Sequence, residues 1–174
     1  LIVRWPGVSA KGVVRNELMT QVDILPTVME VLGMACPDGL AGTSFVPLLK
    51  DEQIEWRTHL FAEWGSGGPV TYFPQRCVRD GRYKLIANLL HDRPSPSALG
   101  YSDPGRKWAP GATEEEIAGA DEHIQAVYEL YENPPEFELY DLQNDPWEFE
   151  NLSGDRAYAA VAQGLKNRLA TWQE

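Results

Sequence analysis

The sequence contains few of the residues that build self-contained catalytic or metal centres. Its 174 residues include two cysteines and three histidines, and His59, His91 and His123 are too far apart for metal-ligand spacing. A glycine-rich phosphate loop, a Cys-x-x-Cys pair, a His-Glu-x-x-His motif and a Gly-x-Ser-x-Gly elbow are all absent. We therefore expect no zinc site, P-loop or serine-hydrolase triad here, and we interpret the histidines as ordinary surface or hydrogen-bonded residues.

Positive charge is also scarce, because 15 Lys and Arg stand against 26 Asp and Glu, a formal net charge of −11. Binding to nucleic-acid phosphates depends on a basic surplus, so the composition argues against a nucleic-acid partner. It argues equally against an anionic membrane surface. No stretch is long and apolar enough to span a bilayer. A local cationic pocket for an anionic substrate stays open, since net charge describes the whole surface.

Neither the first residues nor the cysteines identify a cellular compartment. Residues 1–7, LIVRWPG, contain no Met, basic n-region or cleavage-like segment, so we do not interpret them as a signal peptide. They are typical of a strand entered partway through a longer protein. Cys36 and Cys77 could form one disulfide or remain thiols, and their separation does not decide between the two.

The first 50 residues have the pattern of a strand, a loop and a helix. Residues 1–5 are an apolar run typical of a buried strand. A helix is expected to begin near Thr20, where Thr20 and Asp23 offer N-cap oxygens, and to end with Gly33 at C′. A lone strand and helix cannot cover their own edges. We therefore assign residues 1–50 to the end of a larger α/β catalytic domain and residues 51–174 to a C-terminal subdomain.

The subdomain is predicted to be α+β, with a small antiparallel sheet of about four strands and a C-terminal helix packed on one face. The strands are expected at residues 60–64, 75–79, 82–88 and 136–142. Asp80-Gly81 predicts a tight type I′ hairpin in which Leu85 and Ala87 face one side and Ile86 the other. Residues 156–172 place apolar side chains on one helical stripe.

Further capping patterns predict helices between these strands. Thr113 and Glu116 form a capping box ahead of one continuous helix face, which Asn133 and the following prolines end. Asp145, followed by Pro146, repeats the N-cap pattern. Asp141 and Asp145 could also be paired carboxylates, but the turn between strand and helix already explains Asp145.

Two places stand out as candidates for ligand contact. Tyr72, Phe73 and Arg76 combine aromatic faces with a guanidinium, as a site for an anionic sugar requires, although a strand start with core aromatics fits equally well. The second place is the hairpin exit, from Asn88 through His91, Asp92 and Arg93, which leads into residues 91–111, a segment rich in Pro, Ser and Gly. That segment is either a functional loop or a solvated, partly disordered excursion.

Four strings carry a family resemblance: LIVRWPG at 1–7, TQVDILPTVMEVLG at 20–33, VTYFPQRCVRDGRYKLIANL at 70–89 and ELYDLQNDPWEFENL at 138–152. The first, second and fourth resemble the C-terminal part of the sulfatase family in the alkaline-phosphatase-like superfamily. The third is most similar to the N-sulfoglucosamine sulfohydrolases, also called heparan N-sulfatases or sulfamidases. The resemblance therefore extends over nearly the whole chain.

The resemblance implies hydrolysis of a sulfate ester or sulfamate on a glycosaminoglycan-type sugar. The family uses a formylglycine made from a Cys/Ser-x-Pro-x-Arg motif, and a calcium ion that acts as a Lewis acid. Neither Cys36 nor Cys77 lies in such a motif. We therefore expect the nucleophile and metal ligands to be missing from this chain, which would be inactive alone, and calcium and formylglycine to belong to an N-terminal part. A periplasmic, secreted or lysosomal location is expected for the parent family.

The same resemblance implies a role for the C-terminal subdomain in closing one wall of the substrate cleft. Arg76 would pair with a substrate carboxylate or sulfate, or would hold an acidic loop residue. Tyr72 and Trp64 would present faces to a sugar ring, and His91 would contribute from the hairpin exit. Many relatives carry a His soon after the strand equivalent to residues 60–64. Residues 65–67, GSG, stand there in this chain, so the exact substrate is left open.

Two alternatives come from other functional classes. One is a binding or assembly module that keeps the fold without chemistry and forms homo-oligomers through exposed strand edges. The other is a related phosphoester hydrolase, which a comparison of sulfate with phosphate esters separates. The substrate sugar and the oligomeric state are not determined by the sequence.

Overall fold

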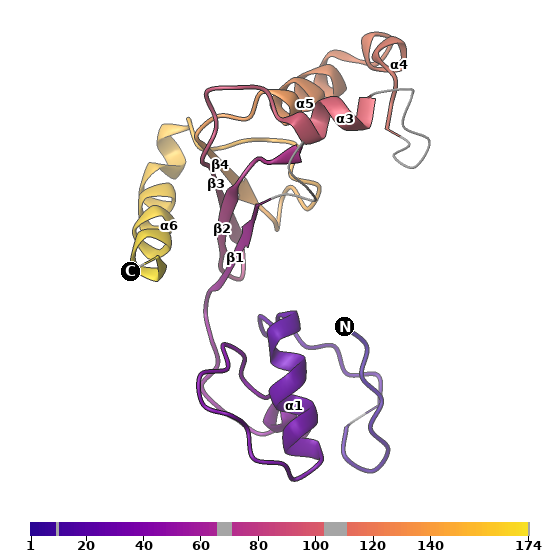
Figure 1. The fold of residues 1–174 in the computed structure, drawn as a ribbon, viewed down its shortest axis with the longest axis vertical. Helices are drawn as coiled ribbons and strands as arrows, with labels where there is room; N and C mark the ends of the chain where they lie inside the picture. Colours follow the sequence, from indigo (N-terminus) through magenta and orange to yellow (C-terminus); the bar gives the residue numbers. More distant parts are fainter. Residues whose placement is uncertain (10, 66–70, 103–110, 174) are drawn as a thin grey trace. The chain divides into compact units, whose positions relative to one another are not determined.

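A computed structural model describes residues 1–9, 11–65, 71–102 and 111–173. The chain divides into two compact units, Leu1–Leu60 and Phe61–Glu174, whose elements are labelled in Figure 1. The boundary expected after residue 50, and the assignment of the first part to a larger domain, remain predictions. No helix in the described ranges combines the length and apolar character that a membrane span needs.

The first unit is built around a short helix. It contains a 3-10 helix, Gln21–Asp23, followed by α1, Ile24–Val31, and α2, Val46–Leu49. The expected helix is confirmed, and Gly33 ends it with a φ of 65°. Residues 1–5 pair with no strand among the described residues, so no strand is assigned there. The expected strand belongs to a larger sheet and remains a prediction.

A buried carboxylate ties this unit together. Asp23 is fully buried, and its two oxygens each lie 2.7 Å from a guanidinium nitrogen of Arg57. They also accept hydrogen bonds from the backbone N–H groups of Thr20 and Thr43, at 2.8 and 2.9 Å. Burial opposes ionisation, but Arg57 and the two backbone donors outweigh it and hold the pKa of Asp23 below its ordinary value.

The second unit contains the predicted four-stranded sheet. Its strands are β1, Leu60–Trp64, β2, Gln75–Arg79, β3, Tyr83–Asn88, and β4, Phe137–Asp141. They are ordered β1-β2-β3-β4, and both the β2–β3 and β3–β4 pairs are antiparallel. The α+β fold class is therefore confirmed.

One face of the sheet is covered by α6, Ala159–Trp172, which follows a 3-10 helix, Arg156–Tyr158. Figure 1 shows α6 running beside the strands. Strand register places alternate residues on this face, where Val78, Leu85 and Leu139 are fully buried. The helix adds Ala162, Leu165 and Leu169 to the same cluster. The predicted packing of the C-terminal helix on the sheet is confirmed.

The β2–β3 hairpin forms, but its turn differs from the expected type I′. The Asp80 N–H donates to the Tyr83 carbonyl at 3.0 Å, so Gly81 and Arg82 occupy the turn. Neither Asp80 nor Gly81 has a positive φ. The Asp80 carboxylate accepts from the N–H groups of Arg82 and Tyr83, both at 2.7 Å. This side-chain bonding stabilises a turn that needs no left-handed residue.

The described residues between β3 and β4 form three helices. They are α3, Pro96–Ser102, α4, Glu114–Ala118, and α5, Glu122–Glu132. The single helix expected after Thr113 is therefore wrong: Gly119 ends α4, and the Asp121 carboxylate caps α5 by accepting from the Ile124 N–H at 2.9 Å. No helix begins at Asp145: residues 146–147 form a turn, and Glu148 takes a φ of 60°.

Both cysteines are free thiols, so the disulfide alternative is not realised. Cys36 is exposed, whereas Cys77 lies on β2 and is half-buried. Burial raises the pKa of the Cys77 thiol.

Candidate functional site

The sheet face opposite α6 carries a cavity of about 380 Å³, which we call the sheet cavity. Strand pairing aligns Gln75 with Asn88 and Ile86 with Glu138, so these side chains share this face. Residues of α3, of α5 and of the segments next to them complete the wall. The lining residues are Trp64, Phe73, Gln75, Ile86, Ser95, Ser97, Leu130, Tyr131, Pro134 and Glu138.

A buried polar network underlies the sheet cavity. Glu138 Oε1 accepts from Asn88 Nδ2 at 2.7 Å, and Glu138 Oε2 accepts from the Tyr140 hydroxyl. Asn88 Nδ2 also donates to the Pro135 carbonyl at 2.7 Å, while Asn88 Oδ1 accepts from Gln75 Nε2 at 2.6 Å. Glu138 is 8% exposed and Asn88 1%. The network holds the Glu138 carboxyl group rigidly at the cavity surface.

The network has a defined electrostatic character. Burial, together with neighbouring Glu138, raises the pKa of Tyr140 well above its ordinary value, so this hydroxyl stays a neutral donor. Both Glu138 oxygens accept hydrogen bonds, which is how an ionised carboxylate binds. Among the described residues, no Lys or Arg lines the sheet cavity. The cavity therefore favours hydrogen-bond donors over anions.

The structure separates two of the predicted site residues. Trp64 lines the sheet cavity and is 57% exposed. Arg76 pairs with Ala87 on the face that α6 covers, and its Nε lies 3.6 Å from Glu63 Oε2. Because Glu63 and Trp64 are consecutive on β1, their side chains point to opposite faces. Trp64 and Arg76 therefore do not share one pocket within the sheet.

Tyr72 and His91 lie outside the sheet cavity. Tyr72 precedes β2 and is 57% exposed, and His91 is exposed in the turn after β3. Sequence reasoning missed Glu138 and singled out Asn88 only as the start of the hairpin exit, whereas the structure buries the two side chains together. The available signal was a polar residue at a strand position whose side chain faces the sheet, since unpaired polar groups are costly to bury.

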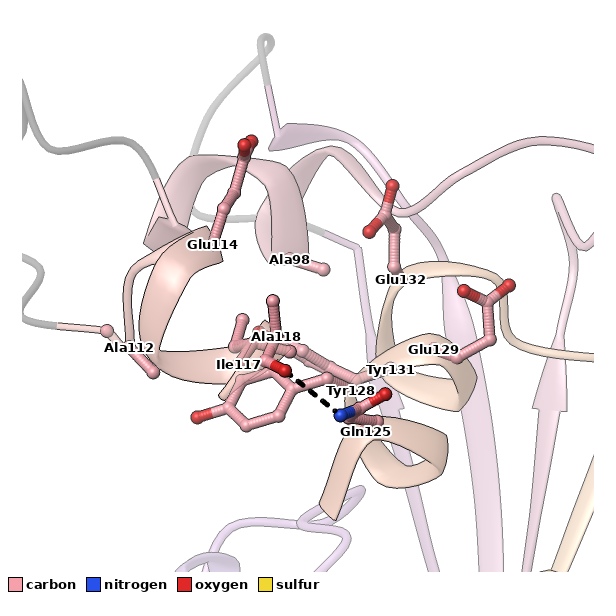
Figure 2. Close-up of a pocket in the computed structure, with 11 residues that line it drawn as sticks. Ala98, Ala112, Glu114, Ile117, Ala118, Gln125, Tyr128, Glu129, Tyr131 and Glu132 are labelled. Carbon is pink, nitrogen blue, oxygen red and sulfur yellow. Dashed lines mark hydrogen bonds between the residues drawn. The ribbon is translucent and has the colours of Figure 1, made fainter. Parts of the chain in front are cut away.

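A second cavity, of about 370 Å³, lies among α3, α4 and α5. Figure 2 shows small and aliphatic residues such as Ala98 and Ile117 beside Tyr128, with the Gln125 side chain bonded to the Ala118 carbonyl at 3.2 Å. Glutamates 114, 129 and 132 also line it. Its lining offers no nucleophile paired with a base, so we assign it no chemistry.

Asp141 and Asp145 stabilise the turn after β4. The Asp141 oxygens lie 2.9 and 2.6 Å from Arg82 Nε and Nη2, and Asn144 Nδ2 donates to Oδ2 at 2.9 Å. The Arg82 hydrogen bonds lower the pKa of Asp141 to about 2. Asp145 accepts from the Glu150 N–H at 2.8 Å. The interpretation of these carboxylates as turn residues is supported, although Asp145 caps a turn rather than a helix.

The sulfatase resemblance implies a calcium ion in the complete enzyme. The described residues of this chain do not form a set of ligands that would bind it. No three His, Cys, Asp or Glu side chains in those ranges gather closely enough to hold a metal. Both Asp141 oxygens are committed to Arg82 and Asn144. Ca²⁺ requires six to eight oxygen ligands, and these carboxylates do not provide such a shell.

Reasoning from the two cysteines missed one match to the nucleophile motif. Ser102, Pro104 and Arg106 fit its serine form, Ser-x-Pro-x-Arg. Ser102 is the last residue of α3, and residues 103–110 lie outside the part of the chain that the structure describes. A short motif of this kind needs its structural context before a role follows.

Comparison with known proteins places these features in a family context. The family model described as "N-sulphoglucosamine sulphohydrolase, C-terminal" matches residues 1–93 and 118–174. The matched ranges contain all four strands, α5, α6 and most of the sheet cavity. Residues 94–117 are unmatched, and they contain α3 and the Ser102 motif.

Individual relatives agree with this match. An ulvan-active sulfatase from Formosa agariphila is 30% identical over 178 residues, covering 99% of this chain and 32% of that protein. The N-sulphoglucosamine sulphohydrolase of Homo sapiens is 25% identical over 191 residues, covering 97% and 37%. The chain therefore spans only about a third of the length of these two relatives.

The fold is also similar to solved structures. A phosphonate monoester hydrolase from Silicibacter pomeroyi superposes with a TM-score of 0.61 at 20% identity, over 98% of this chain and 28% of that one. At this identity the likeness concerns the fold alone.

Proposed function

This chain belongs to the family of N-sulphoglucosamine sulphohydrolase C-terminal regions, among the sulfatases of the alkaline-phosphatase-like superfamily, and from that premise we propose that it shapes the substrate cleft of a longer sulfatase. The match of the family model over residues 1–93 and 118–174 carries the proposal. The substrate is a sulfated sugar of the glycosaminoglycan type, and the reaction is hydrolysis of its sulfate ester or N-sulfate.

In this proposal catalysis and substrate specificity belong to two different parts of the protein. The nucleophile and calcium belong to a part outside this chain, where the ion acts as a Lewis acid on the sulfate. Neither Cys36 nor Cys77 fits the nucleophile motif, and the described residues offer no fitting calcium site. This chain contributes specificity by contacting the sugar, because such contacts decide which substrate reaches the reacting geometry.

The exposure of the predicted residues supports contact with a ligand. Trp64 and Tyr72 present aromatic faces that are each 57% exposed, and His91 is exposed. The Arg76 side chain is 34% exposed, and its 3.6 Å approach to Glu63 leaves guanidinium donors for an anionic group. Because Arg76 and Trp64 lie on opposite faces of the sheet, in this proposal they contact different parts of the substrate. Arg76 binds a carboxylate or sulfate, while Trp64, Tyr72 and His91 contact the sugar.

The direct test compares two polypeptides for release of sulfate from N-sulphoglucosamine and from sugar O-sulfates. We expect hydrolysis by the complete polypeptide and none by the 174-residue chain. Sulfate release by the purified chain would contradict the proposal that the catalytic groups lie outside it. Binding of sulfated sugars by the complete polypeptide without hydrolysis would instead favour the binding-module alternative, and faster hydrolysis of phosphate esters would favour a phosphoester hydrolase.

The motif at Ser102 provides a second test of the same division. We expect mass spectrometry of the complete polypeptide to find Ser102 unmodified and formylglycine at a residue outside this chain. Accordingly, Ser102→Ala should leave sulfate release unchanged. An aldehyde at Ser102, or loss of activity in Ser102→Ala with an unchanged melting temperature, contradicts the proposal.

The role of Arg76 has a matched control on the same strand. In the complete polypeptide, Arg76→Ala should raise KM for the sulfated sugar by about tenfold, because a charge-assisted hydrogen bond is lost. Arg79→Ala removes a neighbouring cation on β2 and should leave KM unchanged. If Glu63→Gln reproduces the whole effect of Arg76→Ala, Arg76 acts by holding Glu63 rather than by touching substrate.

A further inference from the structure

The sheet cavity has a chemistry that differs from a sulfate site. The cavity has a volume of about 380 Å³, which lies within the range of volumes found for small-molecule binding sites. Trp64 and Phe73 provide aromatic surface, while Gln75, Ser95, Ser97 and Glu138 provide polar groups. This combination of apolar wall and a few converging polar groups is typical of a ligand pocket rather than of a packing defect.

Glu138 retains unused hydrogen-bonding capacity. An ionised carboxylate offers about four acceptor positions. The protein fills one on each oxygen, through Asn88 at 2.7 Å and through the Tyr140 hydroxyl. Glu138 also lines the cavity, so its remaining lone pairs are available to hydroxyl or amino donors of a ligand. The two protein donors fix the carboxylate orientation before any ligand arrives.

The same carboxylate disfavours an anionic ligand group. A carboxylate repels another anionic group, and in the part of the chain that the structure describes no Lys or Arg lines the cavity to offset the charge of Glu138. A sulfate or carboxylate therefore fits poorly here. A neutral pyranose fits well, because its hydroxyls donate and its apolar face can lie against an aromatic ring.

We propose that the sheet cavity binds an unsulfated pyranose ring, with Glu138 accepting from its hydroxyl or amino groups and Trp64 against its apolar face. The inference deepens the proposed function, on which it rests, by assigning a neutral sugar unit to this chain. The sulfate group is then bound elsewhere in the complete enzyme. The positions of the hydroxyl and amino donors on the sugar then decide specificity. A sugar whose donor lies in the wrong place leaves a Glu138 oxygen without that hydrogen bond.

The test measures binding of methyl N-acetylglucosaminide, a neutral pyranose, to the complete polypeptide by calorimetry or ligand-observed NMR. The Glu138→Gln and Trp64→Ala variants should bind about tenfold more weakly, the loss expected when a buried hydrogen bond or an aromatic contact is removed. Glu136→Gln and Trp147→Ala are matched controls at exposed positions, and they should bind as the unmodified protein does.

The outcomes separate this inference from the proposed function. Absence of binding, or equal binding by Trp64→Ala and the unmodified protein, overturns the inference even where sulfate release is intact. Selective weakening in both variants supports it even where sulfate release is absent, in which case only the proposed function fails. Because Trp64 is 57% exposed, Trp64→Ala keeps the test decisive if Glu138→Gln does not fold.

Discussion

Asp141 shows how a single side chain organises residues 141–146, DLQNDP, which begin at the end of β4. Arg82 from the hairpin turn makes two hydrogen bonds with it, and Asn144 and the Gln143 N–H add two more. The carboxylate is 2% exposed. The string DLQNDP thus has a structural explanation, in which one ionised group connects two strands and the following turn.

The first prediction concerns the pH dependence of this residue. The pKa of Asp141 is lowered to about 2 in the folded protein, against about 3.9 for an unfolded Asp. The stabilisation is therefore fully present above pH about 4 and disappears as pH falls through about 2. Urea unfolding at several pH values should show Asp141→Asn less stable than the unmodified protein at pH 7, with the difference shrinking below pH 4.

The control for that experiment is Asp38→Asn, which changes an exposed carboxylate. Its free energy of unfolding should follow that of the unmodified protein across the same range. A difference between Asp141→Asn and the unmodified protein that stayed constant down to pH 2 would show that ionisation of Asp141 does not contribute to stability.

At the scale of elements, the residues that end and cap helices explain why the helix boundaries differ from those expected from hydrophobic periodicity. The apolar residues of α4 and α5 have the spacing of one continuous helix, yet Gly119 ends α4 and Asp121 caps α5. In α6 hydrophobic periodicity predicts the buried side correctly, because Leu165 and Leu169 are both buried. Local hydrogen bonds decide such boundaries, whereas periodicity reports only which side is buried.

The second prediction concerns a glycine inside α6. Gly164 lies on the exposed side, and an added Cβ would meet no atom within 4 Å. Gly164→Ala should therefore stabilise the protein by about 0.5–1 kcal/mol, since Ala loses less conformational entropy in a helix. Thermal or urea unfolding measures this change.

Gly42 provides the contrast. A Cβ there would lie 2.0 Å from the Val22 carbonyl oxygen, so Gly42→Ala should destabilise the first unit through a backbone clash. If both Gly-to-Ala variants shifted stability in the same direction, the local packing at these two glycines would be described wrongly.

For the whole molecule, the main feature is its division into Leu1–Leu60 and Phe61–Glu174. Each unit has its own anchoring ion pair: Asp23 with Arg57 in the first, and Asp141 with Arg82 in the second. Segments with separate internal contacts can open separately, with different free energies. The division therefore predicts independent local unfolding.

The third prediction tests that independence. Asp23→Asn removes the charge that pairs with Arg57, and loss of one partner of a buried pair is destabilising. Amide hydrogen exchange of α1 should become at least about tenfold faster, while protection of β3 stays unchanged. Equal loss of protection in α1 and β3 would show that the two units unfold as one.

The sequence alone determined the family, the α+β class, the four strands and the C-terminal helix, because motifs and hydrophobic periodicity are local properties of the chain. Candidate residues also came from the sequence, Arg76 from a local pattern and Trp64 from the family resemblance, and their roles remain proposals. Sequence patterns did not reveal that these two side chains face opposite sides of the sheet.

Tertiary structure decided which residues share a site. Strand register brings Gln75, Asn88 and Glu138 together on one face, although more than sixty positions separate the first from the last. The net charge of −11 suggested a role for a few placed cations, yet the described residues that line the sheet cavity include a carboxylate and no cation. A composition sums charge over the chain, whereas a site depends on the side chains that folding places within hydrogen-bonding distance.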